Sequence, residues 1–293
     1  MHKLLLLLLI MLTLRTAKAT YSIVATDAKS GQVGGSGTSC VGSLDVAVIL
    51  GAAPGIGAIH AQAQLNEAGR DRGVELLKEY KTPSDIIAEI TSSDFDFNFL
   101  INARQYAVVD LLGRASAFTG ANNGKHASDV QGRKLNYTYS IQGNILTSRA
   151  VINQSEVAFV QDGLACDDLP ERLMLALEAG GLNGEGDSRC TTTRGIPADS
   201  AFIKVYHKTG EVLLSLSVSG TKGSSAIPPL REMFDAWRSK AGCIRDANST
   251  FTTTEAPTTL SQPPPLSTTP SLDAVSTPAG LALAHIALVI FAL

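Results

Sequence analysis

The sequence predicts an α+β fold in which two antiparallel sheets lie face to face and helices cover both outer faces. Strand pairs come first along the chain, helix pairs follow, and strands and helices then return. Because this order does not alternate strictly, a parallel doubly wound sheet is disfavoured. Frequent glycines and alanine-rich stretches indicate closely packed layers, and the sequence has no internal repeat.

The expected strands begin at residues 20–25 and 32–36, which are joined by a polar turn that ends on Gly31. Short apolar runs, extended runs and hairpins continue the pattern. They lie at residues 46–50, 56–60, 106–111, 114–118, 139–146, 201–206 and 212–218.

Other segments have helical periodicity. In residues 67–80, Val74 and Leu77 recur at helical spacing with charged residues between them. Thr82 and Pro83 open a second helix, with the proline just inside its start. The remaining helices are expected at residues 168–179 and 228–240.

The chain begins with the features of a secretory signal peptide. A cationic start precedes a leucine-rich apolar run at residues 4–14, and Ala17 and Ala19 supply the small residues that signal peptidase requires. Residues 1–19 are therefore expected to be removed, which makes Thr20 the first residue of the mature protein. The domain that follows, residues 20–245, is long enough for one large domain with a substantial core.

The C-terminal part changes composition abruptly. About two-thirds of residues 249–278 are serine, threonine or proline, which predicts an extended stalk over residues 246–278. The apolar tail, residues 279–293, is shorter than the about 20 residues that a membrane-spanning helix needs. It fits the tail of a glycolipid-anchor signal better, which predicts display on the outer cell surface. A single C-terminal membrane span is the alternative.

The cysteines and the glycosylation sequons agree with a secretory route. All four cysteines lie within residues 20–245, and none forms a C-x-x-C pair, so two disulfides are favoured over a metal site. The three sequons begin at Asn136, Asn153 and Asn248.

The net charge of the chain disfavours one class of binding partner. The formal net charge is −3, so no basic field attracts nucleic acid. We expect a small-molecule or peptide-like substrate and attachment to the membrane through the C-terminal lipid or tail. No cofactor is expected, and a homo-oligomer stays open.

A free threonine at the start of a strand has chemical consequences. In N-terminal-nucleophile hydrolases the hydroxyl of the first residue attacks, and the α-amino group of the same residue serves as the base. Thr20 would have this position after cleavage, although every secreted protein has some residue after its cleavage site.

Several stretches in order resemble the domain-of-unknown-function 1028 family over residues 20–242. They are TYSIVA at 20–25, GGSGTSC at 34–40, GIGAIHAQA at 55–63, RQYAVVD at 104–110, FTG at 118–120, IQGNIL at 141–146 and GDSRC at 186–190. The resemblance implies a four-layer α/β/β/α sandwich of the N-terminal-nucleophile (Ntn) hydrolase type, with Thr20 at the active-site position. It implies no substrate, since the reaction of that family is not established.

These motifs contain the candidate site residues. Besides Thr20 as nucleophile, the polar side chains of Gln62, Gln142 and Asn144 and the backbone amides near Ser36 are candidate donors to an oxyanion. No charged residue lies between Lys29 and Asp45, where threonine hydrolases such as the proteasome β-subunits carry an acidic and a basic residue. An inactive scaffold that serves as a surface binding or adhesion module is therefore the competing hypothesis.

The same motifs suggest a disulfide pairing. Cys40 and Cys190 both lie inside family-like motifs, whereas Cys166 and Cys243 lie outside them. We therefore expect the pairs Cys40–Cys190 and Cys166–Cys243, out of three possible pairings.

Overall fold

The computed structural model describes residues 19–243, except for the side chains of residues 98 and 99. Apart from Ala19, the expected signal peptide lies outside the described residues, and so do the stalk, the apolar tail and the sequon at Asn248. The first described residues lead directly into the centre of a sheet.

That sheet is six-stranded and antiparallel, in the order β10-β9-β2-β1-β8-β7. Its strands are β1 (Thr20–Asp27), β2 (Gln32–Ser39), β7 (Ser128–Lys134), β8 (Tyr137–Asn144), β9 (Ser200–Tyr206) and β10 (Val212–Val218). Strand β1 pairs along its whole length with both neighbours. Thr20 therefore lies opposite Ser39 of β2 on one side and Asn144 of β8 on the other.

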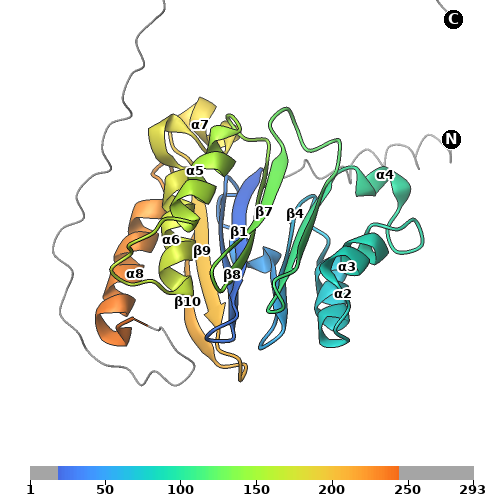
Figure 1. The fold of residues 1–293 in the computed structure, drawn as a ribbon. Coiled ribbons are helices and arrows are strands. Elements are labelled where there is room, and N and C mark those ends of the chain that lie inside the picture. Colours follow the sequence, from blue (N-terminus) through green and yellow to red (C-terminus); the bar gives the residue numbers. More distant parts are fainter. Residues whose placement is uncertain (1–18, 244–293) are drawn as a thin grey trace, which may run out of the picture. The chain divides into compact units, whose positions relative to one another are not determined.

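A second antiparallel sheet, with four strands in the order β3-β4-β5-β6, packs against the first (Figure 1). Its strands are β3 (Leu50–Ala53), β4 (Gly57–Ala63), β5 (Arg104–Asp110) and β6 (Ala115–Thr119). Contacts between β1 and β4 and between β5 and β8 join the two sheets.

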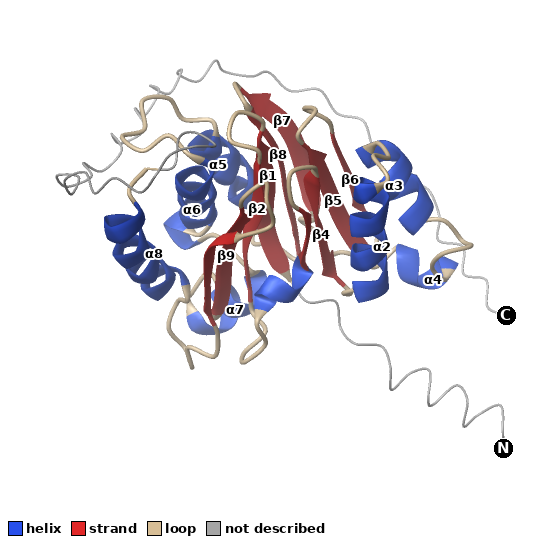
Figure 2. Cartoon of the chain, turned by 90° about the horizontal axis from the view of Figure 1, so that it is seen from below, coloured by secondary structure: helices blue, strands red, loops and turns tan. Residues whose placement is uncertain are grey.

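Helices cover the outer faces of both sheets (Figure 2). The six-stranded sheet is covered by α5 (Ala150–Phe159), α6 (Leu169–Gly180) and α8 (Ile227–Ala241), and the four-stranded sheet by α2 (Glu67–Lys78) and α3 (Pro83–Ile90). The shorter helices are α4 (Asn98–Ile101) and α7 (Ser188–Arg194). The predicted mixed fold of two antiparallel sheets with outer helices is confirmed.

Successive residues of β1 face opposite layers. Tyr21 and Ile23 belong to the apolar cluster beneath α5, α6 and α8, whereas Val24 packs against apolar residues of β4 and β5. Because side chains alternate along a strand, Thr20 and Ser22 face the four-stranded sheet. The hydroxyl of Thr20 therefore lies between the two sheets rather than under the helices.

The helix start that the sequence predicts at Thr82 and Pro83 is present, and a similar cap opens α6. The Thr82 hydroxyl accepts a hydrogen bond from the backbone N–H of Asp85 at 3.1 Å, and Pro83 opens α3. Asp168 accepts from the backbone N–H of Glu171 at 3.0 Å and caps α6 in the same way. Each cap satisfies a backbone donor that the first turn leaves without an intrahelical partner.

One segment that was expected to be a strand is not one, and several elements of the structure were not expected from the sequence. Residues 46–50 do not form a strand: Val46–Ile49 is a short 3-10 helix, capped by Asp45, and β3 starts only at Leu50. Strand β7 and helices α4, α5 and α7 have no counterpart in the expectations. Of these, β7 and α7 lack a clear apolar period.

Both disulfides of the expected pairing are present. Cys40 is bonded to Cys190, which ties the end of β2 to α7, and Cys166 is bonded to Cys243. Across residues 19–243, no helix has the length and apolar character required to cross a membrane.

Candidate functional site

Thr20 begins β1, and its hydroxyl has a defined partner. Its Oγ1 donates to the Oγ of Ser39, the residue opposite it on β2, at 3.2 Å. With Ala19 still attached, Thr20 is only 3% exposed and Ala19 is fully buried. The bond that signal peptidase is expected to cleave therefore joins two buried residues in this structure.

The carbonyl of Ala19 is bound by two side chains. The Ser39 hydroxyl donates to this oxygen, and Nη2 of Arg189 donates to it at 3.2 Å. These donors come from β2 and from α7, segments that are far apart in the sequence. The peptide bond that signal peptidase is expected to cleave is thus held at its carbonyl oxygen.

Arg189 is oriented by a buried carboxylate. Its Nε donates to Oδ1 of Asp187 at 3.2 Å, and its Nη2 donates to Oδ2 at 2.9 Å. Asp187 is fully buried and also accepts from the backbone N–H of Cys40 at 2.7 Å. The guanidinium therefore has little freedom to turn away from Thr20.

Gln62 and Asn144 lie beside Thr20, but they contact its backbone. The Nε2 of Gln62 and the Nδ2 of Asn144 both donate to the Thr20 carbonyl oxygen, at 3.3 and 3.5 Å. Both also donate to Oε1 of Gln105, at 2.8 and 3.1 Å. Their amides hold the first residue of β1 in place, which differs from the expected role as donors to an oxyanion.

The structure does not bring the other two candidates to the hydroxyl of Thr20. Gln142 lies opposite Ser22, two residues further along β1, and its amide has no hydrogen-bond partner among the described residues. The backbone amides near Ser36 belong to the interior strand β2, which pairs with β1 on one side and β9 on the other. The Ser36 hydroxyl faces the helices and donates to the carbonyl of Leu173 in α6 at 2.9 Å.

A second hydroxyl, that of Ser22, has a histidine beside it. Nδ1 of His60 lies 2.9 Å from the Ser22 Oγ, which itself donates to Oε1 of Gln62 at 2.6 Å. Because the hydroxyl hydrogen is used in that bond, Nδ1 is the donor to Ser22, the reverse of a nucleophile and its base. Burial lowers the pKa of His60 to about 3, and both residues are fully buried. The pair is part of the polar packing between the sheets.

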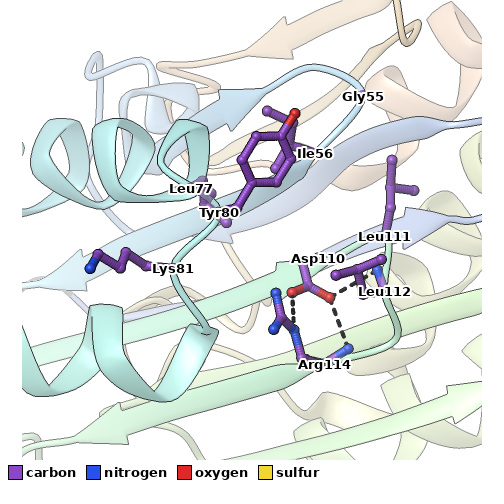
Figure 3. Close-up of a pocket in the computed structure, with 9 residues that line it drawn as sticks. All are labelled: Gly55, Ile56, Leu77, Tyr80, Lys81, Asp110, Leu111, Leu112 and Arg114. Atoms are coloured by element: carbon purple, nitrogen blue, oxygen red, sulfur yellow. Dashed lines mark hydrogen bonds and ion pairs between the residues drawn. The ribbon is translucent and has the colours of Figure 1, made fainter.

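Figure 3 shows the residues that line a cavity of about 80 Å³, among them Asp110 and Arg114. The contact between Asp110 and Thr26 places this cavity toward the end of β1 that is opposite Thr20. Asp110 in its wall accepts from Nε of Arg114 at 2.6 Å, and the carbonyl of the same aspartate accepts from the hydroxyl of Thr26 at 3.0 Å. Thr26 is six residues beyond Thr20, so the cavity is about 20 Å from the Thr20 hydroxyl at the usual rise of a strand. The cavity contains none of the candidate site residues.

Within the described part of the chain, one group of potential metal ligands comes together. It consists of Cys40, Cys190 and Asp199. The two sulfurs are bonded to each other, and Asp199 pairs with Arg194 at 2.8 Å. A disulfide sulfur is not the thiolate that binds metals, so this group is not a metal site.

The sequence did not predict three parts of the Thr20 site: Ser39, Gln105 and the pair Asp187–Arg189. The carbonyl of Ala19 and its Arg189 donor are 170 positions apart. A signal existed: Ser39 directly precedes Cys40, and Arg189 directly precedes Cys190, so the expected disulfide already implied that these two side chains lie close together.

Comparisons with known proteins agree with this fold. The family of unknown function (DUF1028) matches residues 20–226. The chain is similar to the crystal structure of protein SPO2555 from Silicibacter pomeroyi, which carries the same family designation. The two share 23% sequence identity over 75% of this chain and 86% of that chain, with a TM-score of 0.61. No curated protein matches the chain.

Proposed function

Since the chain belongs to the family of unknown function DUF1028, whose name assigns no reaction, we propose an activity from its own site. We propose that the mature protein hydrolyses an amide or related acyl bond with Thr20 as the nucleophile. The fold is then a four-layer sandwich of the N-terminal-nucleophile type.

The coincidence of three features at Thr20 carries this proposal. The residue that signal peptidase would expose is also the first residue of the central strand β1, and its hydroxyl is already hydrogen-bonded to Ser39 between the sheets. The family match also begins at Thr20. A threonine placed by chance after a cleavage site has no reason to coincide with all three.

The chemistry requires only the first residue and water. The Thr20 Oγ attacks a substrate carbonyl carbon while its proton passes to the α-amine, directly or through one water. The amine has a pKa of about 7.7–8.0 in model peptides, which suits a base at neutral pH. The C–N bond of the substrate then breaks as its nitrogen receives the proton, and water hydrolyses the ester on Thr20 to release the acid.

The polar residues around Thr20 support this role by fixing its position. Gln62 and Asn144 hold the Thr20 carbonyl, and Gln105 holds both amides. A nucleophile whose backbone is fixed on a central strand needs little reorganisation before it attacks.

A mature chain that begins at Thr20 should react with a peptide β-lactone. The lactone carbonyl is attacked by a nucleophilic hydroxyl, and ring opening leaves a stable ester whose mass is that of protein plus probe. Intact-mass and peptide mass spectrometry should locate one adduct on Thr20. Thr20→Ser should retain the adduct, whereas Thr20→Ala and a chain that keeps Ala19 should lose it.

The exposed threonine variant Thr192→Ala is a matched control and should react like the wild type. Equal labelling of Thr20→Ala, or no labelling of the wild type, would reject the nucleophile. The inactive binding scaffold would then be the better interpretation.

We further propose that the protein is displayed on the outer cell surface through a lipid anchor. The signal peptide, the stalk and the short apolar tail support this, and Asn136 and Asn153 are exposed as glycan acceptors must be. Phosphatidylinositol-specific phospholipase C should release the protein from intact cells. Retention, with residues 281–293 still present in the mature chain, would indicate a membrane span instead.

A further inference from the structure

Two hydrogen bonds to the Ala19 carbonyl indicate where a substrate would be held. The Ser39 hydroxyl and Nη2 of Arg189 both donate to this oxygen, while the same Ser39 Oγ accepts from the Thr20 hydroxyl. One serine thus contacts both the proposed nucleophile and the carbonyl next to it.

We propose that Ser39 and Arg189 form the subsite for the acyl oxygen of the substrate, and that Asp187 is the positioning residue for Arg189. This rests on the proposed function in one respect only, namely that the acyl group is transferred to Thr20. The subsite takes the carbonyl oxygen of an acyl substrate and the carboxylate of the acid that is released.

Covalent geometry supports the assignment. The Ala19 carbonyl carbon is bonded to the Thr20 nitrogen, and an acyl group on Thr20 would be bonded to its Oγ. The nitrogen, Cα, Cβ and Oγ of Thr20 would close a five-membered ring with a single carbonyl carbon bonded to both atoms. The two acyl positions are therefore neighbours, and the donors that hold one oxygen are within reach of the other.

The donors have the hydrogens that this role needs. Arg189 Nη2 carries two N–H groups, of which one donates to Asp187 at 2.9 Å and the other to the Ala19 oxygen at 3.2 Å. The single hydrogen of the Ser39 hydroxyl points to that same oxygen. After Ala19 has left, one donor of each residue has lost its acceptor and is ready for another oxygen.

The surroundings favour negative charge at this oxygen. The guanidinium is held by a fully buried carboxylate and a short helix, so it does not have to reorganise when charge develops on the substrate. Ser39 is also fully buried, and a hydrogen bond from a buried donor to an ionised oxygen is stronger than one in water.

The leader itself supplies a probe for binding. The peptide acetyl-Ala-Lys-Ala, which is residues 17–19 with a free carboxylate, ends in the group that would occupy the subsite. Titration of the mature chain with this peptide, followed by calorimetry, should show binding to the wild type and to Thr20→Ala. Ser39→Ala and Arg189→Met should each weaken binding about 10-fold to 100-fold, as expected for a lost hydrogen bond to a charged group.

Arg194→Met is a matched control. Arg194 is on the same helix, its side chain is 32% exposed against 33% for Arg189, and it also pairs with a buried aspartate. It should bind the peptide like the wild type. Arg189→Lys, which keeps the charge but loses the two-pronged contact with Asp187, should be intermediate, and thermal unfolding of each variant verifies that it is folded.

Two results would overturn the subsite: no binding of the peptide to the wild type, or equal binding to the wild type, Ser39→Ala and Arg189→Met. The β-lactone reaction separates this inference from the proposed function. Ser39→Ala should slow acylation of Thr20 by about 10²–10³. If the lactone never reacts but peptide binding depends on Ser39 and Arg189, the nucleophile is rejected and the subsite is retained.

Discussion

His60 and Gly35 lie against each other across the two sheets. A Cβ atom at Gly35 would be 2.3 Å from Nε2 of His60 and 2.9 Å from the carbonyl oxygen of Ile23. The absence of a side chain on β2 thus makes room for the imidazole of β4. Through its Nδ1, the same imidazole contacts Ser22, two residues beyond Thr20.

Gly35→Ala should therefore destabilise the domain. The added methyl group would collide with the ring and with the backbone of β1, and overpacking of this kind costs about 1–3 kcal/mol. Denaturant unfolding should show a lower free energy of unfolding. In a His60→Ala background, Gly35→Ala should lower the free energy of unfolding by less than it does in the wild type, although the Ile23 contact still costs some stability. If the losses from the two substitutions simply add, the methyl group and the imidazole do not collide.

The stability of the domain should fall in mild acid because of His60. Burial lowers its pKa from 6.5 to about 3, so the unfolded chain takes up a proton at higher pH than the folded one does. This contribution to stability is complete above pH about 6.5 and is lost as the pH falls toward 3, by about 1.4 kcal/mol per pH unit.

The matching variant is His60→Asn, whose amide can replace Nδ1 but does not titrate. The free energy of unfolding of the wild type, measured between pH 4 and 7, should decline more steeply than that of His60→Asn. If the two curves of free energy against pH are parallel, His60 takes up its proton in the folded protein as readily as in the unfolded chain.

Gln105→Leu should weaken the network that holds Thr20. Gln105 accepts from Gln62 and Asn144 and donates to the carbonyl of Gly143 at 2.9 Å, so its loss leaves buried amides without partners. Each such orphaned group costs about 1–3 kcal/mol. Calorimetric melting should show this loss, whereas the exposed Gln131→Leu should change stability by less than about 0.5 kcal/mol.

The two disulfides should differ in their effect on the site. Replacement of either pair by alanines should cost about 2–5 kcal/mol in stability. Only Cys40→Ala/Cys190→Ala should also slow the β-lactone reaction, because that bond joins the residues next to Ser39 and Arg189. Equal slowing by Cys166→Ala/Cys243→Ala would mean that the effect is one of general stability.

Much of the architecture was predictable because strong local signals agree with it. Helices α3 and α6 begin at capping side chains followed by apolar periodicity, and these signals are properties of the local sequence. Helix α7, with the sequence SRCTTTR, has no apolar stripe, and β7 has no buried residue on either face. Elements of this kind are defined by what packs against them, so their own residues do not reveal them.

The site was harder to predict than the fold for a related reason. Strand β2, with the sequence QVGGSGTS, does not alternate between apolar and polar residues, so the sequence does not show which residues face the helices. The GGSGTSC motif predicts backbone donors near Ser36, whereas the side chain that contacts Thr20 is that of Ser39, three residues further on. The register of β8 likewise decides that Asn144 rather than Gln142 lies opposite Thr20.

The bond between Cys40 and Cys190 would also determine when the proposed subsite can form. Ser39 and Arg189 belong to segments that are 150 residues apart, and the disulfide is the covalent link between them. Such bonds form in oxidising compartments and not in the cytosol. On the proposed secretory route, a newly made chain would stay inactive until translocation supplies both the oxidant and the peptidase. The subsite would then be completed in the same compartment in which the threonine is exposed.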